Sequence, residues 1–540
     1  MISTGMYLTK LLEAYGVDTV FGIPGVHTVE LYRGLAGSSI RHITPRHEQG
    51  AGFMADGYAR VSGRPGVCFI ITGPGMTNIV TAMGQAYGDS IPMLVISTVN
   101  SHGHMGSGEG WLHELPNQQA LVSQVTAFSH TVNRPEELAP VLARAFAIFD
   151  SARPRPVHIE LPINVMLADA GHLKVPESPM RLAPPEPGYE ELIWAADLLN
   201  GAKAPLILAG GGAKWAAEEI TSLAERLDAP VVMTTNGRGI LPPGHPLAVS
   251  ISPSFPATRA LVAASDVVLA LGTEFGPTDY DMYEDGFFEI PGRLIRVDLD
   301  PAQLIRGAIP EIGIVGDALS AAGDLAEMVG QQDRGGKARA DSAREEGAVR
   351  DLTAQMRGDL HILDLVRDTL PGVIFAGDST QLVYAGNLGY ESAGPCRYFN
   401  SATGYGTLGY GLPAGLGAKA ARPDTPVVVL AGDGGVQFSI AELASAKDAK
   451  LPIILMLHDN KGYGEIKSYM VSQNIPTLGV DLYTPDFIGI GRAYGWHSER
   501  VTDLDGLKAA LAAASGRDEP TMILFGDELR DEAKGIVTAG

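Results

Sequence analysis

Two residues that could bind a cation follow neighbouring strands predicted in the last third of the chain. Asp433 stands in Gly-Asp-Gly after the β-branched run 427–430, and Asn460 follows the apolar run 451–457. A helix predicted between the runs makes the strands parallel, so both carboxyl ends meet at one edge of the sheet. A carboxylate and an amide oxygen there suit Mg²⁺, which takes about six oxygens, phosphates among them. The alternative is a simple turn of glycine and Asp433.

Other residues that could take part in catalysis or binding also follow predicted strands or begin predicted helices. Glu48 begins a helix rich in small residues after Arg46-His47, where it could act only as a first-turn carboxylate stabilised by the helix dipole. Ser379 and Thr380 follow the strand 373–376 and could donate to a phosphate or cap a helix. Leu408, in the glycine-rich segment 404–411, could be an ordinary core leucine. Ser439 and Glu442 have the spacing of a capping box, which predicts a helix to about residue 450.

These segments, with residues 55–60 and Lys461-Gly462-Tyr463-Gly464, closely resemble the thiamine diphosphate enzymes of the acetolactate synthase and 2-oxo acid decarboxylase superfamily. The resemblance covers essentially the whole chain. It implies that Asp433, Asn460 and the carbonyl of Gly462 bind Mg²⁺, and that Glu48 carries the proton that activates the aminopyrimidine ring. Leu408 would wedge between the two cofactor rings, beside the carbonyl of Gly406. The other implied cofactor contacts are Gly25, Pro74, Asn78, Ser379, Thr380, Gly434, Gly435, Tyr463 and Gly464.

The resemblance also places substrate contacts. Val26, His27 and Thr72 would lie near the reacting carbons. Separately, the flexible glycines of the segment 106–116 predict a loop over the active site, with His113 as a catalytic residue and Glu114 beside it. A solvated histidine and glutamate without a role are the alternative. Acetolactate synthases carry Phe-Gln-Glu where this chain has Leu112-His113-Glu114.

The segments 21–27, 112–115 and 151–158, with an acidic run from Asp279 and Asp281 to Asp285, are similar to the 5-guanidino-2-oxopentanoate decarboxylase subgroup. Carboxylates suit a guanidinium because it takes bidentate hydrogen bonds. The alternative is a solvated acidic loop. The candidate carboxylates for the cationic tail are Glu109, Glu114, Asp279, Asp281 and Glu465.

The predicted activity is therefore release of CO₂ and an aldehyde from a 2-oxo acid with a cationic tail. An acetolactate synthase-type carboligase acting on pyruvate is the runner-up, and a regulatory homologue without activity is a third reading. Residues 250–254 and 273–281 depart from the flavin-binding segments of acetolactate synthases, so bound FAD is doubtful although residues 209–212 read Ala-Gly-Gly-Gly.

Length and composition predict the organisation. The 540 residues favour three or more domains, and a proline-rich and a charged linker divide the chain into 1–175, 188–330 and 350–540. Strands and helices alternate in all three blocks, which predicts three doubly wound α/β domains with parallel sheets. A net charge of −22 argues against nucleic acid or an anionic membrane as partner. With neither a secretory signal nor a membrane span in the sequence, a cytoplasmic enzyme is expected. In the superfamily Glu48 of one subunit faces the diphosphate motif of another, which implies a homodimer or homotetramer.

Overall fold

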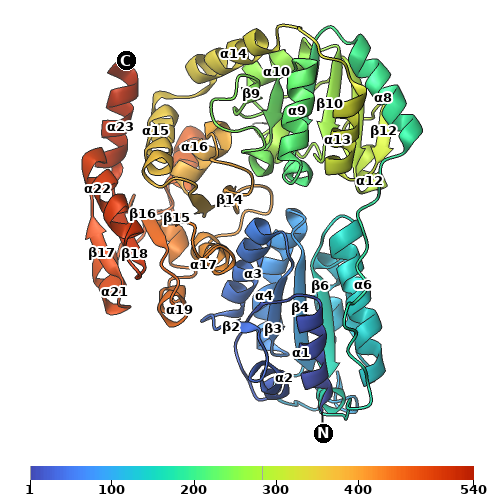
Figure 1. Cartoon of the computed structure of the whole chain (residues 1–540). Helices are drawn as coiled ribbons and strands as arrows, with labels where there is room; N and C mark the ends of the chain where they lie inside the picture. Colours follow the sequence, from blue (N-terminus) through green and yellow to red (C-terminus); the bar gives the residue numbers. More distant parts are fainter. Residues whose placement is uncertain (1, 283, 287, 540) are drawn as a thin grey trace.

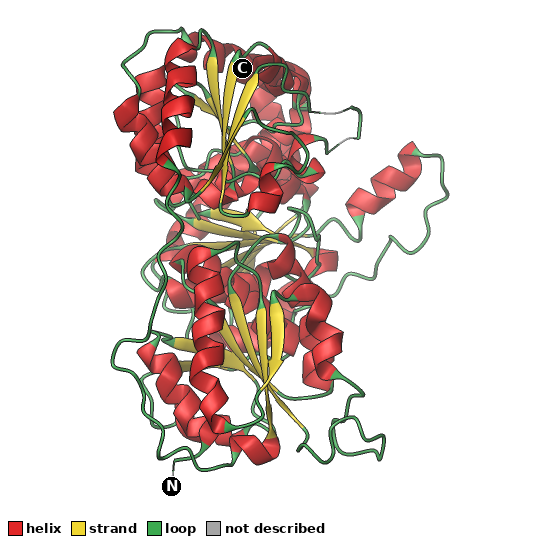
Figure 2. Cartoon of the chain, turned by 90° about the vertical axis from the view of Figure 1, so that its right-hand side faces the viewer, coloured by secondary structure: helices red, strands yellow, loops and turns green. Residues whose placement is uncertain are grey.

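The computed structural model describes residues 2–282, 284–286 and 288–539 and contains three separate six-stranded sheets, each wholly parallel. Helices cover both faces of each sheet, and the three units follow one another along the chain (Figures 1 and 2). Parallel strands need crossover connections, and the helices between them supply these. The predicted fold class, three doubly wound α/β domains, is confirmed.

The first sheet has the order β2-β1-β3-β4-β6-β5. Ser3 caps its first helix by accepting a hydrogen bond from the amide of Met6, and Leu8, Leu11 and Leu12 are fully buried on one face of that helix. The strands are β1 (Thr19–Gly22), β2 (Arg41–Ile43), β3 (Gly66–Ile70), β4 (Met93–Val99), β5 (Phe128–Thr131) and β6 (Val157–Pro162). The helices are α1 (Thr4–Ala14), α2 (Val29–Leu35), α3 (Glu48–Ser62), α4 (Pro74–Gly88), α5 (Gln118–Val122), α6 (Leu138–Ser151) and α7 (Ile163–Met166).

The second sheet has the order β12-β11-β10-β7-β8-β9. The charged stretch 331–346 that follows it, predicted as a linker, is in part the helix α14, which buries Ala340 and Ala343. The strands are β7 (Pro205–Ala209), β8 (Val231–Met233), β9 (Ala248–Val249), β10 (Val267–Leu271), β11 (Arg293–Asp298) and β12 (Ile312–Val315). The helices are α8 (Tyr189–Gly201), α9 (Ala217–Leu227), α10 (Pro256–Ala263), α11 (Pro277–Tyr280), α12 (Pro301–Leu304), α13 (Ala318–Met328) and α14 (Gly336–Glu346).

The third sheet has the order β14-β13-β15-β16-β18-β17. Its strands β15 and β16 are neighbours, with Gly432 opposite His458, as the sequence predicted for the strands before Asp433 and Asn460. The strands are β13 (Ile374–Gly377), β14 (Tyr398–Asn400), β15 (Val427–Gly432), β16 (Ile454–His458), β17 (His497–Arg500) and β18 (Thr521–Phe525). The helices are α15 (Ala354–Thr369), α16 (Gln381–Gly389), α17 (Gly411–Ala421), α18 (Asp433–Val436), α19 (Glu442–Asp448), α20 (Gly464–Ser472), α21 (Phe487–Ala493), α22 (Leu504–Ser515) and α23 (Asp527–Ala539).

The N- and C-terminal domains of the chain meet along α3 and α17, which lie side by side (Figure 1). The helices are so close that a Cβ on Gly417 would lie 1.8 Å from the carbonyl oxygen of Met54. Glu442 is buried at the same junction and accepts the backbone amides of Arg46 and His47, at 3.0 and 3.1 Å. The predicted capping box is therefore wrong, because Glu442 holds the two domains together instead of capping its own helix. No helix of the described chain is long and apolar enough to cross a membrane.

Candidate active site

Three oxygens converge where β15 and β16 end. The side-chain oxygen of Asn460 lies 2.8 Å from the carbonyl oxygen of Gly462 and 2.9 Å from Oδ1 of Asp433. With the amide turned over, its nitrogen would donate to both, but the buried Oδ2 of Asp433 would still lack a partner among the described residues. Burial, and then the charge of Asp459, raise the pKa of Asp433. A cation between the three oxygens would satisfy them and favour the charged carboxylate, so these residues fit a metal ion.

The loop after Asn460 is folded tightly around this oxygen cluster. A Cβ on Gly464 would lie 2.6 Å from Nδ2 of Asn460, and one on Gly434 would lie 2.7 Å from the ring of Tyr463. The amide of Tyr463 donates to the carbonyl of Val480 at 2.9 Å, which fixes the loop. Only glycine permits so close an approach, and the contact of these glycines with the cofactor stays a prediction.

Asp378, Ser379 and Thr380 border the same edge of the sheet. Asp378 is buried, accepts the amides of Ser379 and Gly411 at 2.8 and 3.2 Å, and has its pKa raised to about 6 by burial. Thr380 stands at the N-cap of α16, but its side chain makes no capping hydrogen bond. A Cβ on Gly432 would lie 3.4 Å from Oγ1 of Thr380, so this hydroxyl faces the turn that carries Asp433.

Glu48 lies at the first turn of α3 and is half-buried. Its Oε2 accepts a hydrogen bond of 2.9 Å from Nδ2 of Asn78 on α4. A Cβ on Gly75 would lie 3.4 Å from Oε1 of Glu48, and one on Gly25 would lie 2.4 Å from the side chain of Ile71. The turn that holds Gly25, after β1, and the turn that holds Gly75, after β3, therefore lie together beside Glu48. Pro74, at the start of α4, is exposed.

His27 and His113 meet beside that turn. Their rings lie 5.2 Å apart, and Nδ1 of each is buried without a hydrogen-bond partner in the described part of the chain. Burial, and then the charge of His113, lower the pKa of His27, so this ring is held neutral. His113 has a left-handed backbone, with φ +59°, and its carbonyl accepts the hydroxyl of Thr72 at 3.3 Å. A strained, non-glycine residue of this kind is typical of functional sites.

Gly73 allows the loop that carries His113 to lie close to the turn after β3. It has φ +69°, and a Cβ there would lie 2.7 Å from the carbonyl oxygen of His113. Gln118, which sequence reasoning missed, accepts the amide of Gly73 at 3.3 Å and donates to the buried Glu160 at 2.9 Å. A lone glutamine carries no pattern that would have revealed this contact. Val26, also predicted to touch the substrate, is 69% exposed in the single chain.

Leu408 is half-buried and belongs to none of the hydrophobic clusters described for the chain. Gly406, two residues earlier, is exposed with φ +76°. The hydroxyl of Thr407 between them donates to Gln85 of α4 at 3.0 Å and holds the segment against the N-terminal domain. The reading of Leu408 as a core leucine is therefore not supported, and its role as a wedge stays a prediction.

Four of the predicted substrate carboxylates are occupied by groups of the protein. Asp279 is half-buried in the central domain and accepts the amide of Thr235 at 3.0 Å, and Asp281 pairs with Arg259 at 2.9 Å. Glu114 takes hydrogen bonds from the loop itself. Its donors are the hydroxyl of Ser107 and the amides of Gly108, Gly110 and Trp111. Glu109 accepts the indole N–H of Trp111 at 3.1 Å.

Comparison with known proteins identifies the family. The domain models for thiamine pyrophosphate enzymes match in order: the N-terminal TPP binding domain over residues 2–121, the central domain over 192–325 and the C-terminal TPP binding domain over 378–525. The chain is a thiamine pyrophosphate enzyme.

Several relatives of this thiamine pyrophosphate enzyme match along most of their length. A probable 2-ketoarginine decarboxylase of Pseudomonas aeruginosa is 45% identical over 97% of this chain and 93% of its own. A probable acetolactate synthase large subunit of Methanocaldococcus jannaschii is 30% identical over 96% and 90%. The acetolactate synthase isozyme 1 large subunit of Escherichia coli is 32% identical over 85% and 82%. The resemblance to this superfamily is confirmed.

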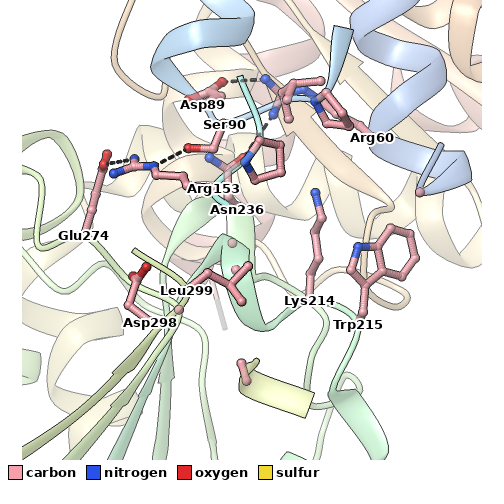
Figure 3. Close-up of a pocket in the computed structure, with 18 of the residues that line it drawn as sticks. Arg60, Asp89, Ser90, Arg153, Lys214, Trp215, Asn236, Glu274, Asp298 and Leu299 are labelled. Atoms are coloured by element: carbon pink, nitrogen blue, oxygen red, sulfur yellow. Dashed lines mark hydrogen bonds and ion pairs between the residues drawn. The ribbon is translucent and has the colours of Figure 1, made fainter. Parts of the chain in front are cut away.

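This thiamine pyrophosphate enzyme also has a large cavity away from these turns. The cavity, of 580 Å³, lies where the three domains meet, and of the predicted site residues only Asp279 lines it. Arg153 reaches across it to Ser90, at 2.8 Å, and to Glu274, while Lys214 and Trp215 stand on the other side (Figure 3). Glu274 belongs to the segment 273–281 that departs from the flavin-binding pattern, and the prediction that this chain does not bind FAD is untested.

Proposed function

We propose that this thiamine pyrophosphate enzyme converts 5-guanidino-2-oxopentanoate, the 2-oxo acid of arginine, into CO₂ and an aldehyde. The observation that carries the proposal is the identity of 45%, over nearly the whole of both chains, with a probable 2-ketoarginine decarboxylase. Glu48 with Asn78 and the oxygen cluster of Asp433, Asn460 and Gly462 support an active enzyme, since a regulatory homologue would have no need of them.

Each half of the site has its own task in this proposal. Asp433, Asn460 and the carbonyl of Gly462 would hold Mg²⁺, and Ser379, Thr380 and the glycine amides would hold a diphosphate. When bound, thiamine diphosphate supplies the electron sink that lets CO₂ leave a 2-oxo acid. Glu48, positioned by the 2.9 Å hydrogen bond from Asn78, would carry a proton to and from the pyrimidine ring.

His113 and His27 would manage the proton of the product. Release of CO₂ from a 2-oxo acid anion consumes one proton, which ends on the carbonyl carbon of the aldehyde. His113 lies against Gly73 of the turn that Glu48 borders, and the lowered pKa of His27 favours its neutral ring beside it, so one ring can donate while the other accepts. We propose His113 as the donor, with Val26 and Thr72 near the reacting carbons.

The product distinguishes this proposal from its main alternative. The acetolactate synthases among the relatives favour carboligation, in which two molecules of pyruvate are joined with loss of one CO₂. With pyruvate as the sole substrate we expect little acetolactate, because His113 replaces the glutamine of the Phe-Gln-Glu segment. A colorimetric assay for acetolactate, with aldehyde measured by a coupled dehydrogenase, checks this expectation. Efficient acetolactate synthesis would make the carboligase the correct assignment.

The arrangement of the two half-sites supports an obligate homodimer, with a homotetramer as a dimer of such dimers. Within one chain, no hydrogen bond or ion pair between described residues joins the Glu48 turn to the oxygen cluster, since the domains meet through α3, α17 and Glu442. Helix α20, next to the cluster, buries no residue of its own. It and the loop after it expose apolar side chains, namely Ile466, Tyr469, Val471, Leu478 and Tyr483. An exposed apolar surface of this kind is typical of a protein interface.

Sedimentation velocity with activity measured in the same fractions tests this assembly. We expect the active species to have at least twice the mass of the 56.9 kDa chain. Ile466→Asp, which places a charge on the exposed face of α20, should shift the protein to a monomer without activity. A monomer with full activity would contradict the shared site.

A further inference from the structure

Glu465 is the one predicted substrate carboxylate on the helix that directly follows the oxygen cluster. It lies in the first turn of α20, five positions after Asn460, and it is exposed. Its Oε2 accepts a hydrogen bond of 2.7 Å from Nε2 of Gln381. The other four carboxylates lie in the glycine-rich loop or the central domain and already have donors there.

The neighbours of Glu465 come from one helix, α16, whose start borders the predicted diphosphate site. Gln381 is its first residue, and Tyr384 lies one turn further along. Tyr384 lies three positions after Gln381 and therefore on the same face of α16, and burial and then the charge of Glu465 raise its pKa. Gln381 uses its amide nitrogen on Glu465, so its amide oxygen remains as an acceptor. The described side chains therefore offer an anion, a neutral acceptor and an aromatic ring.

We propose that Glu465, Gln381 and Tyr384 bind the guanidinium tail of the substrate and set the specificity for it. A guanidinium is a planar fork of N–H donors that meets both oxygens of a carboxylate and stacks on an aromatic face. Gln381 holds the carboxylate in place and accepts a further N–H. This inference rests on the proposed function, because it assumes a 2-oxo acid with a cationic tail.

The proposed dimer strengthens this pocket. Glu465 precedes Ile466 on the exposed face of α20, so a second copy that covers the helix would remove water from around the carboxylate. A charged pair shielded from water is stronger than an exposed one, and loss of one partner then costs much more. Neutral 2-oxo acids would leave Glu465 unpaired in the covered site and would bind less well.

The test uses Glu465→Gln, which removes the charge and keeps the shape. We compare kcat/KM for 5-guanidino-2-oxopentanoate and for 2-oxooctanoate, a neutral acid of matching length. We expect kcat/KM for the cationic acid to fall by roughly 30-fold or more, and kcat/KM for the neutral acid to rise, because the variant no longer leaves a charge unpaired. Glu519→Gln is the matched control, since Glu519 is exposed in the same domain and pairs only weakly with Lys447, at 3.4 Å.

Binding of n-butylguanidine, measured by calorimetry on the same proteins, gives a readout that needs no turnover. Glu465→Gln should weaken it by a similar factor, and Glu519→Gln should not. If the unmodified enzyme favours the guanidino acid and Glu465→Gln keeps that preference, the inference is wrong and the proposed function stands. If the unmodified enzyme releases CO₂ from no 2-oxo acid, the proposed function is wrong and this inference falls with it.

Discussion

Replacement of Glu48 by glutamine is expected to lower kcat by roughly 100- to 10,000-fold, the usual contribution of a positioned proton carrier. Glutamine can still accept the hydrogen bond from Asn78 at the first turn of α3, so the local structure should be kept. Thiamine diphosphate should therefore bind nearly as well as before. Stopped CO₂-release assays measure the loss of turnover, and calorimetric titration with thiamine diphosphate measures the retained binding.

A matched control separates this role from a structural one. Glu190 is an exposed glutamate in the first turn of α8, and Glu190→Gln should leave both turnover and cofactor binding unchanged. If Glu48→Gln turned over at a near-normal rate, Glu48 would be only a first-turn carboxylate that interacts with the helix dipole, and the assignment of the active site would be wrong.

Replacement of Asp433 by asparagine should have the second large effect, on binding rather than on proton transfer. Asp433 is the only carboxylate in the three-oxygen cluster, and its second oxygen is buried without a partner among the described side chains. Loss of the charge should weaken Mg²⁺-dependent binding of thiamine diphosphate by roughly 100-fold or more, since even changes around metal ligands cost 10- to 100-fold. Titration of the chelator-treated protein with Mg²⁺ at fixed cofactor concentration measures this.

Asp505→Asn on α22, an exposed first-turn aspartate, is the control and should bind Mg²⁺ and cofactor as the unmodified chain does. Among the described residues no group of three or more His, Cys, Asp or Glu could hold a metal. The oxygen cluster is of another kind, with one carboxylate, one amide and one backbone carbonyl. An unchanged Mg²⁺ requirement in Asp433→Asn would show that the cation binds elsewhere.

The sheet edge that carries the oxygen cluster could be predicted because it depends on local pattern. Apolar runs ending in glycine and Asp433 predicted β15 and β16 as parallel neighbours, and their register confirms it. The family followed from short motifs whose glycines permit close backbone approach. Such features are encoded within a few residues of one another, so one sequence is enough to find them.

Contacts between distant segments could not be predicted in the same way. Glu442 had the spacing of a capping box, but the packing of α3 on α17 brings the amides of Arg46 and His47 to it instead. The acidic run at Asp279 suggested a free anionic surface, whereas Thr235 and Arg259 already occupy its carboxylates. Which carboxylate stays free depends on partners far away in the chain, and no local spacing reveals them.

The most direct test of the central claim is a comparison of CO₂ release from four 2-oxo acids by the purified enzyme with Mg²⁺ and thiamine diphosphate. The acids are pyruvate, benzoylformate, 4-methyl-2-oxopentanoate and 5-guanidino-2-oxopentanoate. We predict the highest kcat/KM for 5-guanidino-2-oxopentanoate, with an aldehyde as the product. A higher kcat/KM for benzoylformate or for the branched aliphatic acid would contradict a site built for a cationic tail.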